Sequence, residues 1–201
     1  MYLSKVFLHP GKLNNAYEWH RSLWTLFPNI ERGNTAPFLY HVESLNLATG
    51  AHVLMQSSSP PIKRSVYAKV LAMKPFPIQF YAGQSLRYLV HANPTKCITD
   101  THDKPRKKNN GKCRVPIIKE DEQFDWLRRK LADVAVIHVI SIRDHAPTYF
   151  RKGSRVGKIA VSTFTGVLEV RDPDMMQDIR QKGIGSAKAF GCGLMLVKRL
   201  K

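Results

Sequence analysis

Acidic residues are scarce in this sequence, and several familiar catalytic signatures are missing. Its 201 residues include 15 Asp and Glu against 32 Lys and Arg. The carboxylates are scattered, whereas a two-metal nuclease needs several of them close together to hold its ions. The sequence also lacks a GxSxG elbow, an HExxH motif and a Walker loop. We therefore expect no metal ion and no other cofactor in whatever chemistry the chain performs.

Cysteines are few, and no long apolar run is present. Cys97, Cys113 and Cys192 form no CxxC pair, which is typical of free thiols in a reducing compartment. His91, Cys97, His102 and Cys113 lie near one another in the sequence but match no zinc-ligand spacing. No apolar stretch approaches the roughly 20 residues of a membrane span, and the N-terminal one is too short for a signal peptide. We expect a cytoplasmic protein with no membrane partner.

Positive charge is what the sequence has in excess, with a formal net charge of +17. Lys and Arg release condensed counterions when they bind nucleic acid, so phosphate is the commonest partner of such a chain. An anionic membrane surface and an architectural role are the alternatives at this level. Hydrophobic residues make up 43% of the chain, which is enough for the packed core of one or two domains. The composition favours a folded protein that binds RNA or DNA.

Hydrophobic periodicity predicts the same order of elements twice. In the first half, we expect strands at 2–8, 38–43, 52–56 and 78–81, and helices from Asn14 or Asn15 to about Phe27 and at 66–73. In the second half, we expect strands at 86–92, 134–140, 159–170 and 194–197, and helices at 121–131 and from the Asp172-Pro173 cap to Gly183. A repeated βαββαβ order predicts an α+β protein of two tandem ferredoxin-like (RRM-like) domains, residues 1–83 and 84–201.

Two basic segments interrupt this order. Residues 101–114 hold six Lys and Arg around an Asn-Asn-Gly sequence, which predicts a flexible loop. Residues 148–158 (TYFRKGSRVGK) place Arg151, Lys152, Arg155 and Lys158 around two glycines, and the strand-like flanks predict a basic β-hairpin. We expect the hairpin to contact RNA. For residues 101–114, a solvated loop and an RNA contact stay equally open.

The first predicted helix carries the best candidates for acid–base chemistry. Cleavage of RNA by its own 2′-hydroxyl needs a base, an acid and cationic stabilisation of the phosphorane. Histidine suits the proton transfers near neutral pH. His20 lies just outside the apolar stripe that contains Trp19 and Leu23, Tyr17 lies one turn before it, and Arg21 follows it. The pattern alone favours the alternative, a partly buried histidine at the edge of the core.

A glycine-rich segment, GIGSAKAFGCG, precedes the last predicted strand and contains Gly185, Lys188, Gly191 and Gly193. It is no dinucleotide-binding fingerprint, because a helix rather than a strand comes before it. Glycines permit positive φ and a close approach of the backbone to a phosphate chain. A tight connection between helix and strand is the alternative.

Segments along nearly the whole chain resemble a known family. The tail GIGSAKAFGCGLMLV is similar to the C-terminal glycine-rich loop of the RAMP superfamily. The start, MYLSKV followed by YEWHRSLWTLFP, resembles the N-terminus of the CasE family, the crRNA-processing endoribonucleases of type I-E CRISPR systems. FLYHVE, HVLMQS, LVHANPTK and CRVPIIKEDEQFDWLRRKL match the pattern of the same family in the same order.

This resemblance implies two ferredoxin-like domains and an endoribonuclease. Such a protein binds the hairpin of the CRISPR repeat, cuts at the 3′ base of the stem, and stays on the crRNA beside the other Cascade subunits. The catalytic tyrosine and histidine of the family fall on Tyr17 and His20, and its groove-entering hairpin corresponds to Arg151 and Lys152. The residues expected to contact RNA are Arg21, Arg151, Lys152, Arg155, Lys158, Gly185, Lys188, Gly191 and Gly193. A non-catalytic protein that binds structured RNA on the same fold is the main alternative; no helix-turn-helix supports a DNA binder.

Overall fold

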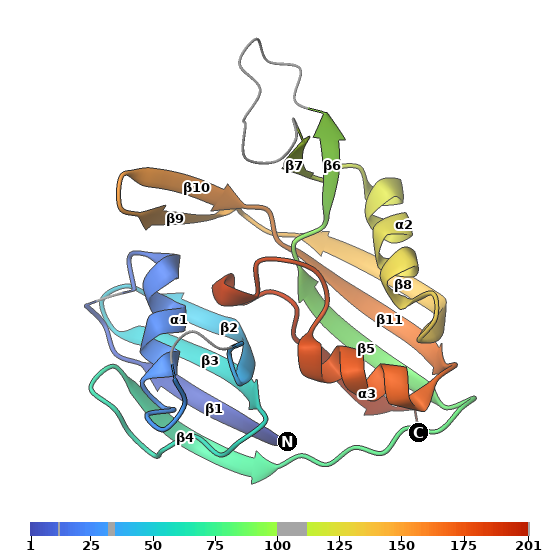
Figure 1. The fold of residues 1–201 in the computed structure, drawn as a ribbon. Helices are drawn as coiled ribbons and strands as arrows, with labels where there is room; N and C mark the ends of the chain where they lie inside the picture. Colours follow the sequence, from blue (N-terminus) through green and yellow to red (C-terminus); the bar gives the residue numbers. More distant parts are fainter. Residues whose placement is uncertain (12, 32–34, 100–111, 201) are drawn as a thin grey trace.

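The N-terminal half forms a four-stranded antiparallel sheet with one helix on it. The computed structural model describes residues 1–11, 13–31, 35–99 and 112–200. The strands run in the order β2-β3-β1-β4, and α1 covers one face of the sheet (Figure 1). The bounds are β1 (Tyr2–Leu8), α1 (Ala16–Trp24), β2 (Phe38–Asn46), β3 (Gly50–Ser57) and β4 (Ala68–Pro75). This strand order is that of a ferredoxin-like fold.

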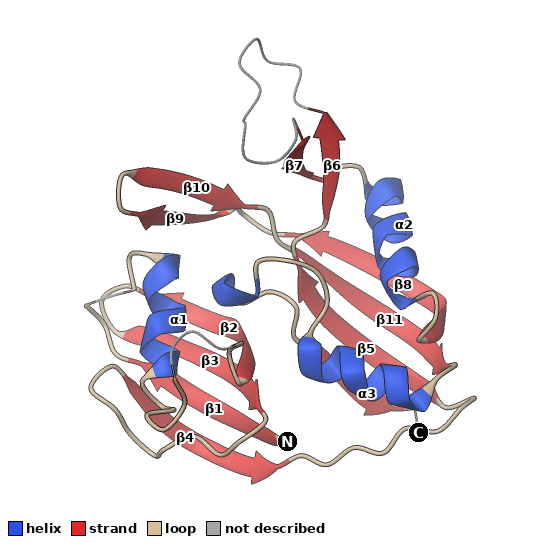
Figure 2. Cartoon of the chain, viewed as in Figure 1, coloured by secondary structure: helices blue, strands red, loops and turns tan. Residues whose placement is uncertain are grey.

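The C-terminal half repeats this arrangement and completes it. Its sheet has the order β12-β5-β11-β8, and two helices lie on the same face of it (Figure 2). The bounds are β5 (Ser85–Ala92), α2 (Glu120–Leu131), β8 (Ala135–Asp144), β11 (Ser162–Val170), α3 (Pro173–Lys182) and β12 (Met195–Arg199). The predicted fold of two tandem ferredoxin-like domains is therefore confirmed.

Two hairpins extend from the second domain. One, β6 (Thr95–Thr99) with β7 (Lys112–Pro116), lies between β5 and α2. The other, β9 (Thr148–Lys152) with β10 (Arg155–Ile159), lies between β8 and β11 and extends over the end of α1 (Figure 1). The hairpin predicted at 148–158 is confirmed. Of the predicted basic loop at 101–114, only residues 112–114 are described, and they begin β7.

The predictions for residues 66–73 and 78–81 were wrong. Residues 68–75 are strand β4, because pairing with β1 places Ala68 opposite Leu8 and Val70 opposite Val6 at the edge of the sheet. Such long-range pairing overrides local helix preference. Residues 58–67 form a loop with two prolines, so the first domain lacks the second helix of the βαββαβ pattern. Residues 76–84 link the two sheets, where Phe80 packs into the second core.

Local capping explains where the helices that border the site begin. The Asn15 side chain accepts a hydrogen bond from the Tyr17 N–H (3.1 Å), and the Asp172 carboxylate accepts from two N–H groups at the start of α3. Each sheet packs with its helices around a separate hydrophobic core. We propose residue 83 as the domain boundary between these cores. None of the helices within the described ranges is long and apolar enough to cross a membrane.

Candidate functional site

The Asn15 side chain, at the start of α1, joins the first domain to the second. Besides capping α1, Asn15 donates from Nδ2 to the Arg151 carbonyl (2.8 Å) and accepts from the Arg151 N–H (3.0 Å). These two bonds join residues that are 136 positions apart in the sequence. One amide side chain therefore fixes both the start of α1 and the position of the β9–β10 hairpin against it.

Aromatic packing reinforces this junction. The Phe150 ring of β9 lies 4.5 Å from the Phe190 ring, which belongs to the short 3-10 helix η2 (Lys188–Phe190) in the glycine-rich segment. Both rings pack against the core of the first domain. The buried Tyr40 hydroxyl donates to the Ala189 carbonyl (2.8 Å). Helix α1, the hairpin and the glycine-rich segment therefore form one surface.

Tyr17 and Lys152 meet on this surface. The Lys152 ammonium lies 5.4 Å from the centroid of the half-buried Tyr17 ring. Side chains alternate between the two faces of a hairpin, so Lys152 shares a face with Phe150, which packs toward the first domain. The structure thus brings together a residue predicted for catalysis and a residue predicted for RNA binding.

His20 lies one turn after Tyr17, among aromatic side chains. Its ring is 5.3 Å from Phe38, 6.1 Å from Trp24 and 6.4 Å from Tyr40, measured between centroids. Burial against these rings lowers the pKa of His20 below its usual value of 6.5. Its imidazole is therefore mostly uncharged at neutral pH and can accept a proton.

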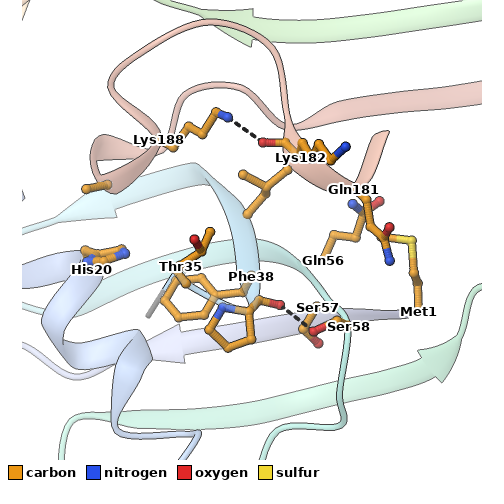
Figure 3. A pocket seen from close by; sticks show the side chains of 14 residues that line it. Met1, His20, Thr35, Phe38, Gln56, Ser57, Ser58, Gln181, Lys182 and Lys188 are labelled. Atoms are coloured by element: carbon orange, nitrogen blue, oxygen red, sulfur yellow. Dashed lines mark hydrogen bonds between the residues drawn. The ribbon is translucent and has the colours of Figure 1, made fainter. Parts of the chain in front are cut away.

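A cavity of about 400 Å³ opens beside His20 (Figure 3). Phe38 and Gln56 of the first sheet line it, and Lys182 and Lys188 of the second domain line its other side. The Lys188 ammonium donates to the Lys182 carbonyl. Burial, and then repulsion from Lys130, lowers the pKa of Lys188. The pocket therefore combines a histidine with a nearby cation at the domain junction.

Other residues predicted to contact RNA lie outside this cluster. Arg21 is exposed and pairs with Glu18 on its own helix (3.0 Å). Arg151 and Lys158 lie on the face of the hairpin opposite to Lys152, directed away from α1. Arg155 is opposite Lys152 in the hairpin register, but its side chain lies outside the described part of the structure. An RNA contact at these residues stays a prediction.

The three glycines singled out by the sequence adopt a backbone conformation that favours glycine. Gly185, Gly191 and Gly193 all have positive φ, between 77° and 92°. A side chain at Gly185 would place its Cβ 2.9 Å from the Trp126 ring. The Gly193 N–H donates to the His91 carbonyl (2.6 Å). The positive φ values account for glycine at these positions without RNA, so a role of these residues in binding stays a prediction.

Sequence reasoning missed a group of histidines at the domain junction. The rings of His41 and His91 stack with centroids 3.3 Å apart, and His145 shares a hydroxyl partner, Thr163, with His91. Burial and the neighbouring histidines lower the pKa of His41 to about 4 and that of His91 to about 3. No spacing in the sequence indicates this contact. Within the described residues, no group of three or more His, Cys, Asp or Glu is placed to hold a metal ion.

The chain is thus a basic protein of two ferredoxin-like domains, in which the basic hairpin of the second domain lies against the helix of the first that carries Tyr17 and His20. Residues 1–199 match the family model described as CRISPR associated protein, and the chain belongs to this family. It is 42% identical over 197 residues to the Cascade subunit CasE of Escherichia coli K12, a match that covers 97% of this chain and 98% of that protein. It is 26% identical over 219 residues to the CRISPR-associated endoribonuclease Cse3 of Thermus thermophilus, covering 98% and 99% of the two chains.

Solved structures agree with this relationship. The crystal structure of Cas6e from Escherichia coli K-12 superposes with a TM-score of 0.86 at 39% identity and covers 100% of both chains. Cse3 bound to a 19-nucleotide RNA superposes with a TM-score of 0.78 at 27% identity, covering 98% of this chain and 100% of that one. The fold is therefore shared with a protein that has been solved with RNA.

Proposed function

We propose that this protein is an endoribonuclease that binds the hairpin of a CRISPR repeat and cuts the RNA without a metal ion. It cuts at the 3′ base of the stem, stays on the crRNA and joins the other subunits of Cascade. The observation that carries the proposal is the cluster on α1, where Tyr17 and His20 lie one turn apart and Lys152 lies over the Tyr17 ring. The names of the CasE and Cse3 relatives support it.

The proposed reaction uses the 2′-hydroxyl of the RNA as nucleophile. Unprotonated His20 takes the proton of this hydroxyl, and the oxygen attacks the adjacent phosphorus. The bond from phosphorus to the 5′ oxygen breaks, and the Tyr17 hydroxyl donates to the leaving oxygen. Lys152 stabilises the charge of the phosphorane. The products are a 2′,3′-cyclic phosphate and a 5′-hydroxyl.

Charge and shape support hairpin RNA as the substrate. The net charge of +17 favours a polyanion. The outer face of the β9–β10 hairpin exposes Arg151, Lys158 and the ring of Tyr149. The major groove of A-form RNA is deep and narrow, so a hairpin enters it most easily near a helix end, where the proposed cut lies. Cse3 has been solved with an RNA that represents a pre-cleavage complex.

Cleavage of labelled repeat RNA tests the proposal. One substrate is all RNA, and its matched control carries a single 2′-deoxy nucleotide at the cut. We expect the RNA to be cut in excess EDTA, and the control to be bound with similar affinity but not cut. Activity that EDTA abolishes, or cleavage of the 2′-deoxy substrate, would contradict the mechanism. Binding of both without any cleavage would identify a non-catalytic RNA-binding protein.

A further inference from the structure

A second pocket, of about 530 Å³, lies between α2, the β6–β7 hairpin and the glycine-rich segment. Trp126 of α2 and Gly185 form part of its wall. Arg114 is opposite Cys97 in the hairpin register, so the two side chains share the hairpin face that borders the pocket. A pocket of this size holds a nucleotide or a small ligand.

Three cations from three different elements line this pocket. They are Arg114 of β7, Lys130 of α2 and Lys188 of η2. No acidic residue lines it, and none of the three cations forms a salt bridge with a carboxylate in the described part of the chain. Burial and repulsion from Lys130 lower the pKa of Lys188. An anion between these side chains would relieve their mutual repulsion.

A buried hydroxyl at the pocket also suits an anion. The Ser186 hydroxyl oxygen is buried and has no hydrogen-bond partner among the described residues. Buried hydroxyls are nearly always hydrogen-bonded, so a ligand oxygen would complete its bonding. Gly185, with a φ of 77°, packs against the Trp126 ring and so holds the neighbouring Ser186 at the pocket wall.

Lys188 links this pocket to the candidate cleavage site. Its side chain lines both the pocket that contains His20 and the pocket that contains Arg114. A polyanion that extends from the first pocket to the second would therefore pass Lys188. A continuous chain of phosphates explains this arrangement better than an isolated small anion or an acidic segment of a protein.

We propose that the pocket formed by Arg114, Lys130, Lys188 and Ser186 binds a backbone phosphate of the RNA, outside the nucleotide that is cut. The proposal rests on the proposed function, because it takes the bound polyanion to be the substrate RNA. Contacts of this kind set the position and register of a nucleic acid without reading its sequence. The pocket would hold either a stem phosphate or a phosphate of a single strand that flanks the hairpin.

The test compares two double variants in RNA binding. Arg114→Ala with Lys130→Ala removes two cations of the pocket. Lys119→Ala with Arg129→Ala removes two exposed cations of the same region that do not line it. Affinity is measured between 50 and 300 mM salt with three uncleavable 2′-deoxy substrates: the hairpin alone, the hairpin with its upstream strand, and the hairpin with its downstream strand. Circular dichroism confirms that each variant is folded.

We expect the pocket variant to bind about five- to eightfold more weakly at 0.1 M salt, with a log–log salt slope smaller by about 0.7–0.9, the effect of one lost phosphate contact. A loss that is already seen with the hairpin alone assigns the bound phosphate to the stem. A loss that is seen only with a flanking strand assigns the phosphate to that strand. An unchanged slope on all three substrates, or an equal loss in the control variant, would overturn the proposal. Failure of the wild-type protein to bind any repeat hairpin would instead refute the proposed function.

Discussion

Replacing Asn15 with alanine should weaken the attachment of the β9–β10 hairpin to α1. The Asn15 side chain caps α1 through the Tyr17 N–H (3.1 Å), and its amide makes two hydrogen bonds to the backbone of Arg151 (2.8 and 3.0 Å). Alanine removes all three bonds but leaves the hydrophobic contacts of the hairpin in place. The change therefore tests how much this one side chain contributes to holding the hairpin against α1.

The expected cost follows from the two kinds of bond. Loss of an N-cap typically costs about 1 kcal/mol. The bonds to Arg151 are exposed, so each contributes at the low end of the usual range, about 0.5 kcal/mol. The sum is about 2 kcal/mol, which corresponds to a fall in Tm of about 4–8 °C for a chain of this length. Affinity for the repeat hairpin should fall as well, because Lys152 is no longer fixed over Tyr17.

Thermal unfolding and an RNA titration of the same protein sample measure both effects. Asn14→Ala is the matched control, because Asn14 is the exposed neighbour with the same side chain and, within the described part of the chain, forms neither the cap nor the bonds to the hairpin. Equal Tm and equal affinity in the two variants would refute the inference that Asn15 joins the two domains. Asn15→Asp keeps the acceptor for the Tyr17 N–H and should recover most of the cap.

Three further predictions concern charge and pH. Arg151→Ala with Lys152→Ala should lower the magnitude of the salt slope of hairpin binding by about 0.7–0.9 per lost phosphate contact, and an unchanged slope would mean that neither touches RNA. With a His91 pKa of about 3, the folded protein binds fewer protons than the unfolded chain below pH 6.5. Stability should therefore fall as the pH drops from 6.5 toward 3, and His91→Gln should make urea unfolding less pH-dependent by up to about 1.4 kcal/mol per pH unit. Because burial lowers the pKa of His20, kcat/KM should be flat near pH 7 and should fall only at a pH below 6.5, the ordinary pKa of histidine. A rise toward acid pH would make His20 the acid instead.

Periodicity and caps predicted most of the elements, because those signals are local. The amphipathic stripe and the Asn14-Asn15 pair predicted α1, and the structure shows that Asn15 is its cap. The Asp172-Pro173 pair and Gly183 predicted both ends of α3. The errors arose where tertiary pairing decides. Residues 68–75 become a strand because β1 offers them an unpaired edge, and no local feature of their sequence indicates that partner.

The candidate site was predictable only as separate pieces. Position on the helix indicated His20 and Tyr17, and the spacing of basic residues indicated the hairpin. The hydrogen bonds that join these pieces could not be predicted, because their partners are far apart in the sequence. Asn15 and Arg151 are 136 residues apart, and Tyr40 and Ala189 are 149 residues apart. The docking of one domain on the other depends on such pairs.

Single-turnover cleavage by a His20→Ala variant tests the central claim most directly. His20 is at the edge of the core, so the variant should fold, and removal of a group that transfers a proton typically costs about 10²–10⁴ in rate. His138→Ala is the matched control, an exposed histidine of the second domain. We predict that the His20 variant binds the hairpin within a few-fold of wild type and cuts it about 10²-fold more slowly, or slower still. The control variant should cut at the wild-type rate. A folded His20 variant that cuts at the wild-type rate would contradict the assignment of this site.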